Sequence, residues 1–231
     1  MENCEDGVCS PAPLDGGDIK KNNSDKQVIY VGDPMCSWCW GISDHLKDLQ
    51  QYLKSEGIGY DIIMGGLRPG GGDEWNQQMK DFLQHHWHEV NSRSGQAFGT
   101  KLFELSEFDY DTEPSCRAVV TAKHFLDIGG VSSFFEEVQR KFYVENEDPK
   151  QVDFYQEICQ KLGIDFGYFK RLFESTETAK ATRDEFVMNR QWGVSGYPTV
   201  LLKDQQELHL IAHGYAEFET MKSNIQKVMT F

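Results

Sequence analysis

The chain has 231 residues and carries 37 acidic against 23 basic side chains, which gives a formal net charge of −14. This acidic balance argues against nucleic-acid binding and against docking on an anionic membrane, since both need clustered Lys and Arg. Aromatic residues make up 13% of the sequence, which argues against a disordered chain. A globular protein with one large core is therefore expected.

The first 25 residues differ in composition from the rest of the chain. Residues 1–18 are polar and acidic, without the basic and apolar regions of a secretory signal. If Met1 is the native start, we expect a cytoplasmic protein. Residues 1–25 also contain Pro11, Pro13 and paired glycines, which predicts a flexible tail.

Residues 26–72 predict a βαβ unit. The apolar, β-branched run 27–32 is typical of a buried strand. Residues 36–54 have apolar side chains at helical spacing, and 60–64 form a second strand-like run. A strand, a helix and a strand in this order predict a parallel pair with a right-handed crossover.

Residues 73–192 predict an α-helical insertion, because nearly every segment has helical periodicity. The expected helices are Trp75–Val90, Pro114–Ile128, Val131–Val144, Val152–Leu162, Phe166–Phe173 and Thr178–Trp192.

Residues 193–231 predict two strands and a final helix. The strands are 199–202 and 207–212, joined by a connection of hairpin length, and the amphipathic helix is 217–229. The predicted order is therefore βαβ, then helices, then ββα.

The chemistry of the chain is expected at a Cys-x-x-Cys motif between the first strand and the first helix, formed by Cys36 and Cys39. Two cysteines three residues apart on a helical turn share one face and are close enough for a disulfide. The helix N-terminus favours the thiolate form of Cys36, which makes it the expected nucleophile. Cys39, one turn inside, would resolve a mixed disulfide. Half of a zinc site is the main competing interpretation of such a motif.

A second motif lies directly before the third predicted strand. The segment Gly193-Val-Ser-Gly-Tyr-Pro-Thr places Pro198 at the start of that strand, where proline is tolerated. A Tyr-Pro bond can be cis at modest cost.

These two motifs, with the long helical block between them, resemble the thioredoxin superfamily and, within it, the DsbA family. Asp33-Pro34 ahead of Cys36 and the Gly65–Pro69 segment make the FrnE-like, cytoplasmic branch the most similar. The resemblance implies an α/β thioredoxin fold with a large α-helical insertion over about residues 26–230. It also implies a protein disulfide oxidoreductase or isomerase acting on protein or peptide thiols.

The same resemblance assigns roles to individual residues. Cys36 would attack, Cys39 would resolve, and Pro198 would be a cis-proline facing Cys36. The backbone at Tyr197 would pair with the substrate chain. Trp38, which lies between the cysteines, is expected to be exposed and to contact substrate.

The chain departs from the family pattern in the strand before the motif. Thioredoxins bury an acid there, whereas residues 28–31 contain none. The proton acceptor for Cys39 is therefore unassigned at this point.

Other candidate sites are weaker. Cys4 and Cys9 are a candidate auxiliary redox pair. A zinc site made from both cysteine pairs has no common ligand spacing. The histidines at 85, 86 and 88 are expected on a solvated helix face, and Cys116 and Cys159 as small buried residues. We expect no metal and no cofactor other than glutathione as a redox partner.

Two other functions stay open. One is a glutathione-dependent isomerase or transferase, although the close relatives with that activity use Ser at the first motif position and lack the second Cys. The other is a non-enzymatic adaptor with a thioredoxin-like surface. The natural substrate, the direction of electron flow and the oligomeric state are not predicted.

Overall fold

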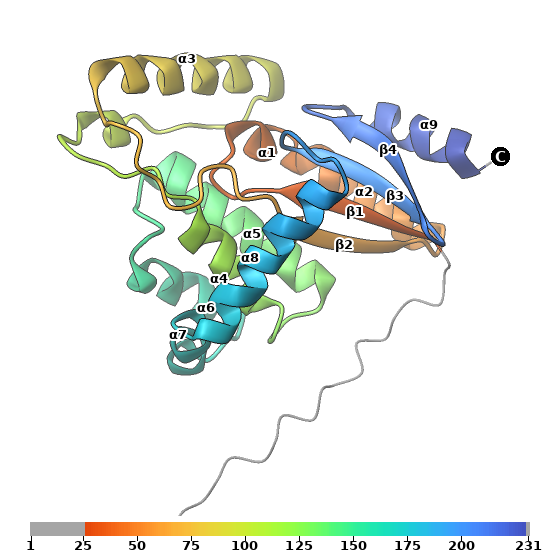
Figure 1. Cartoon of the computed structure of the whole chain (residues 1–231). Coiled ribbons are helices and arrows are strands. Elements are labelled where there is room, and N and C mark those ends of the chain that lie inside the picture. The colour runs from red at the N-terminus through yellow and green to blue at the C-terminus, as the bar shows by residue number, and fades with distance from the viewer. Residues whose placement is uncertain (1–25, 230–231) are drawn as a thin grey trace, which may run out of the picture.

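The computed structural model describes residues 26–229, which contain a mixed four-stranded sheet in the order β2-β1-β3-β4 (Figure 1). Strand β1 (Lys26–Gly32) pairs in parallel with β2 (Gly59–Met64) and antiparallel with β3 (Thr199–Asp204). Strand β4 (Glu207–His213) closes the sheet antiparallel to β3. This is the predicted α/β architecture. Strands β1 and β2 precede the insertion in sequence, and β3 and β4 follow it.

Helices cover both faces of the central strand. Val28 and Tyr30 pack in one core with α2 (Ser43–Ser55) and α9 (Phe218–Met229). Ile29 and Val31 point to the opposite face, where they pack with residues near the end of α8 (Thr176–Gln191). Burial on both faces explains why β1 is a continuous apolar run rather than an alternating one.

The insertion between β2 and β3 consists mainly of helices, most of which gather beside the edge strand β2 (Figure 1). Its α-helices are α3 (Gln77–Ser94), α4 (Glu113–Ala122), α5 (Ile128–Arg140), α6 (Gln156–Lys161), α7 (Phe166–Phe173) and α8. Short helical turns occupy Lys101–Glu104, Lys141–Glu145 and Val152–Tyr155.

An aromatic cluster joins this insertion to the start of the first helix. Trp87, Phe108, Phe142 and Tyr143 pack together with Trp40, which lies in α1 (Ser37–Gly41). The insertion therefore supports the segment that carries the Cys-x-x-Cys motif.

Several predicted helix boundaries were wrong. Residues 36–54 form two helices, α1 and α2, which are separated at Ile42. The helix predicted for 114–128 ends at Ala122, because Asp127 caps a new helix by accepting a hydrogen bond from Gly130 N. The helix predicted for 131–144 is therefore α5, which begins at Ile128, includes the paired glycines 129 and 130 in its first turn, and ends at Arg140.

Among residues 26–229, no helix has both the length and the apolar composition that crossing a membrane requires.

Candidate active site

The first cysteine of the motif lies at the junction of β1 and α1. After β1, residues 33–35 form a turn in which Cys36 N donates to Asp33 O at 3.0 Å, and Cys36 is the N-cap of α1. The Cys36 side chain is 5% exposed, and its Sγ lies 3.5 Å from the carbonyl oxygen of Tyr197. The sulfur that the sequence predicts as the nucleophile is thus next to the second motif.

The second motif is held in place by Tyr197. The Tyr197–Pro198 peptide bond is cis, and Pro198 is buried. The Tyr197 hydroxyl donates to Gly65 O at 2.7 Å, and its ring lies so close to Gly65 that a Cβ there would be 2.4 Å from a ring carbon. Gly65 is therefore required for the position of Tyr197, whose carbonyl faces Cys36.

The second cysteine, Cys39, is completely buried. Burial raises the pKa of its thiol well above the ordinary value, and the neighbouring Cys36 raises it further. The Tyr30 hydroxyl lies beside the sulfur and acts in the opposite direction, but the effect of burial is larger. Cys39 is therefore a neutral thiol at neutral pH.

Asp33 ties the turn to two distant segments. Its carboxylate is fully buried and accepts hydrogen bonds from Met35 N at 2.8 Å, from Leu67 N at 2.7 Å and from the Cys116 thiol at 3.3 Å. Burial raises the pKa of Asp33 above its ordinary value, although these hydrogen bonds oppose the rise. From the sequence, Asp33 was noted only as part of the family motif ahead of Cys36, and its role in the site was missed.

The aromatic cluster of the insertion contacts the same turn. The Tyr110 hydroxyl donates to Met35 O at 2.9 Å, directly before Cys36. The Trp40 indole N–H donates to Ala97 O at 3.0 Å, and the Trp40 ring stacks on Tyr143. The position of Cys36 therefore depends on residues from both the sheet and the insertion.

Comparison with known proteins identifies the family to which the chain belongs. The model of the DSBA-like thioredoxin domain matches residues 75–226. The chain belongs to this family. The matched segment contains the insertion and the Tyr197–Pro198 motif, whereas the Cys36–Cys39 pair precedes it.

Solved structures with a similar fold agree with this assignment. A chain from Nitrosomonas europaea described as a "putative protein disulfide isomerase" is 32% identical, with a TM-score of 0.80 over 90% of this chain and 98% of that one. The cytosolic disulfide reductase DsbM from Pseudomonas aeruginosa is 20% identical, with a TM-score of 0.70 over 88% and 98%. A 2-hydroxychromene-2-carboxylate isomerase is 14% identical, with a TM-score of 0.63 over 88% and 96%. At these last two identities the likeness shows the fold alone. No significant match was found among curated proteins.

Trp38 is less accessible in this DSBA-like chain than expected. The structure places it half-buried, with its ring edge-on to Tyr215 at 6.0 Å between centroids. Tyr215 in turn contacts His45 Nε2 through its hydroxyl at 2.9 Å and lies under the Arg93 guanidinium. The packing of α1 against the segment after β4 explains this burial, and a substrate contact at Trp38 stays a prediction.

The remaining candidates lie away from Cys36 or outside the described part of the DSBA-like chain. Cys4 and Cys9 fall in residues 1–25, which the structure does not describe. His85 Nε2 lies 3.4 Å from Glu89 Oε1 on an exposed face of α3, and no group of three or more metal-ligating side chains occurs in residues 26–229. Cys159 is buried as predicted, and burial raises its pKa to about 12.

Proposed function

We propose that this DSBA-like protein exchanges disulfides with protein or peptide substrates through Cys36 and Cys39. The observation that carries the proposal is the 3.5 Å approach of Cys36 Sγ to the Tyr197 carbonyl. A substrate sulfur bonded to Cys36 would lie beside the backbone of Tyr197. The backbone of Tyr197 is then close enough to the substrate chain to pair with it.

The two thiols have different tasks in this proposal. The Cys36 thiolate attacks a substrate disulfide, forms a mixed disulfide and releases one substrate thiolate. Cys39 then attacks Cys36 Sγ, which forms the Cys36–Cys39 disulfide and releases the second substrate thiolate. The complete burial of Cys39 supports this order, because an external disulfide cannot reach its sulfur.

Glutathione is the proposed redox partner, and the cytoplasm the proposed location. A DsbM structure from Pseudomonas aeruginosa contains GSH, and that protein is named a cytosolic disulfide reductase. A disulfide isomerase activity is also proposed, on the basis of the name of the Nitrosomonas europaea chain. The intact Cys36/Cys39 pair stands against a glutathione transferase, which needs no second thiol.

Reduction of insulin by dithiothreitol or glutathione tests the proposal. The wild-type protein should accelerate the reaction, and Cys36→Ser should abolish the acceleration. Cys159→Ser is a matched control, because it removes a thiol that is fully buried in the insertion. A wild-type protein without activity would support an adaptor, and an active Cys36→Ser variant would overturn the assignment of the nucleophile.

A further inference from the structure

A cavity of about 230 Å³ lies between the first half of the sheet and helices α2 and α5, and it reaches the Cys39 side chain. The Cys39 side chain therefore lies between Cys36 and this cavity. The remaining lining comes from β1, β2, α2 and α5. A volume of this size accommodates several water molecules, since each needs about 30 Å³.

Three buried polar groups that line the cavity lack hydrogen-bond partners within the described protein. They are the Tyr30 hydroxyl, the Tyr60 hydroxyl and the Gln139 side-chain amide nitrogen. Tyr30 and Gln139 are each only 1% exposed. Buried polar groups are normally satisfied by protein or by ordered water. Three such groups from three different elements around one cavity point to bound water inside it.

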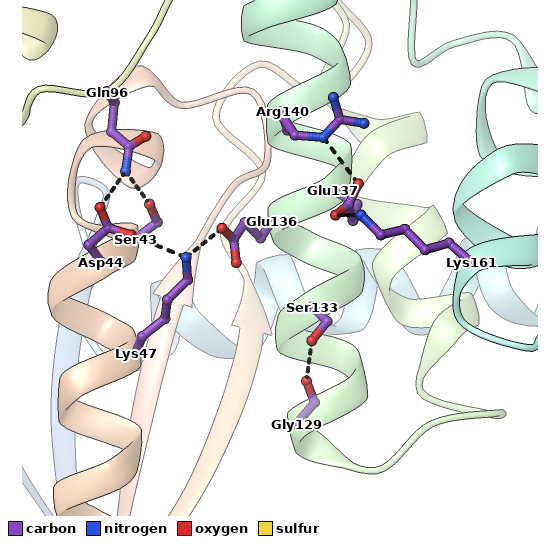
Figure 2. A network of polar contacts seen from close by, with 10 residues as sticks. All are labelled: Ser43, Asp44, Lys47, Gln96, Gly129, Ser133, Glu136, Glu137, Arg140 and Lys161. Atoms are coloured by element: carbon purple, nitrogen blue, oxygen red, sulfur yellow. Dashed lines mark hydrogen bonds and ion pairs between the residues drawn. The ribbon is translucent and has the colours of Figure 1, made fainter.

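The cavity leads from Cys39 to the surface between α2 and α5. Figure 2 shows Lys47 of α2 and Glu136 of α5 pointing toward each other across this space. Their ion pair measures 2.6 Å, and their side chains are 47% and 35% exposed. Both residues line the cavity. This ion pair therefore marks the outer end of the cavity.

Resolution of a mixed disulfide requires that Cys39 lose its proton, although it is buried and neutral. The carboxylate of Asp33 already accepts three hydrogen bonds from Met35, Leu67 and Cys116. The titratable or charged groups around Cys39 and its cavity are Cys36 on α1, Tyr30 on β1, Tyr60 on β2, Lys47 on α2 and Glu136 on α5. Among these, Tyr30 lines the same cavity as Cys39, and its hydroxyl lowers the pKa of the Cys39 thiol against the effect of burial.

Gly32 makes room for this hydroxyl. A Cβ at position 32 would lie 2.4 Å from the Tyr30 hydroxyl oxygen. Residues 30 and 32 point to the same face of β1. The Tyr30 hydroxyl therefore occupies the space that a side chain at position 32 would fill. The strand is therefore built to hold a hydroxyl beside the buried thiol.

We propose that this cavity holds ordered water that carries the proton of Cys39 to solvent, with the Tyr30 hydroxyl as the first carrier. Tyr30 accepts the proton from Cys39 Sγ while its own proton passes to cavity water and leaves beside Lys47 and Glu136. The electron pair on Cys39 Sγ forms the bond to Cys36 Sγ, and the departing substrate sulfur takes the pair of the broken bond. This inference rests on the proposed exchange function and assigns a proton path to it.

The test separates attack by Cys36 from resolution by Cys39. A full-length Cys4→Ser/Cys9→Ser background is mixed with 5,5′-dithiobis(2-nitrobenzoate) in a stopped-flow instrument. The first nitrothiolate is released when Cys36 attacks the reagent, and the second when Cys39 resolves the mixed disulfide. Tyr30→Phe should leave the first phase unchanged, slow the second roughly tenfold or more at pH 7, and shift its pH profile upward.

Tyr168→Phe is the control, because this tyrosine lies in α7 and does not line the cavity. Both phases of this control should match the background protein. A Tyr30→Phe variant with an unchanged second phase and pH profile would overturn the proposed path. A background protein that shows no second phase would instead refute the proposed function.

A second variant keeps the test decisive if Tyr30→Phe does not fold. Ser132 is a half-buried residue of α5 that lines the cavity, and Ser132→Leu fills part of the space with apolar atoms. We expect a slower second phase and an unchanged first phase. Wild-type resolution in a folded Ser132→Leu variant would show that the cavity does not carry the proton.

Discussion

The Sγ atom of Cys36 lies 3.5 Å from the carbonyl oxygen of Tyr197, although 161 positions separate the two residues in sequence. Cys36 follows the central strand β1, and Tyr197 precedes β3, its antiparallel neighbour. The pairing of Val31 with Thr199 brings the two segments together at the same end of the two inner strands. The register of these strands therefore determines the geometry of the candidate site.

Cys39→Ser is expected to trap mixed disulfides. Attack by Cys36 does not require the Cys39 sulfur, whereas release of the substrate does. In a Cys4→Ser/Cys9→Ser background, non-reducing mass spectrometry after mixing with an oxidised peptide should show a stable adduct on Cys36. A Cys36→Ser/Cys39→Ser variant is the control and should form none. An adduct on any other residue would contradict the assigned roles.

Gly65→Ala is expected to displace Tyr197 and reduce exchange. The added Cβ would lie 2.4 Å from the Tyr197 ring, a distance that forces the ring to move. Misplacement of a reacting segment by about 1 Å can reduce a rate by up to about 100-fold. Insulin reduction should be slower while circular dichroism still shows a folded protein.

The control for this prediction is Gly59→Ala at the start of β2, the strand that Gly65 follows. Its added Cβ would lie 3.4 Å from the nearest atom, in the Gln27 side chain. We expect wild-type activity for this variant. Equal activity of the two alanine variants would show that the position of Tyr197 does not limit exchange.

Tyr110→Phe is expected to reduce both stability and exchange. It removes the hydrogen bond to Met35 O and leaves that buried carbonyl without this donor. The free energy of unfolding should fall by about 1–3 kcal/mol. Urea denaturation measures this loss, and Tyr168→Phe, which removes a hydroxyl from α7 outside this cluster, should not reproduce it.

The fold class and family could be predicted from the sequence because their signals are local. The apolar run of β1, the Cys-x-x-Cys motif and the Gly-Tyr-Pro-Thr segment each occupy a few consecutive residues. The break at Ile42 was not predictable, since apolar residues keep their helical spacing across it.

The polar residues that support the site were missed because their partners are distant in sequence. Asp33 precedes a proline and indicates a turn, but its burial depends on Leu67 and Cys116. Tyr30 is one aromatic residue in an apolar strand, and the sequence gives no sign that it lines the same cavity as Cys39. Only the packing of β1 against α2 and α5 creates this cavity.

Asp33→Asn is expected to change how stability depends on pH. Burial raises the pKa of Asp33 in the folded protein above its ordinary value of 3.8. A carboxyl group with a raised folded pKa stabilises the fold fully below its unfolded pKa and loses this contribution as pH rises through the folded value. The wild type should therefore lose this part of its free energy of unfolding as pH rises above about 4. Asp33→Asn should lack that loss, because an amide does not titrate.

Urea denaturation of both proteins between about pH 4 and pH 8 checks this prediction. The variant should also be less stable by about 1–3 kcal/mol at low pH, since an amide cannot replace every hydrogen bond of the carboxyl group. Asp184→Asn is the control, because that carboxylate is exposed on α8 and pairs with Lys180. It should keep the wild-type slope. If Asp33→Asn also keeps that slope, Asp33 does not titrate in this range and is not the buried acid that the structure describes.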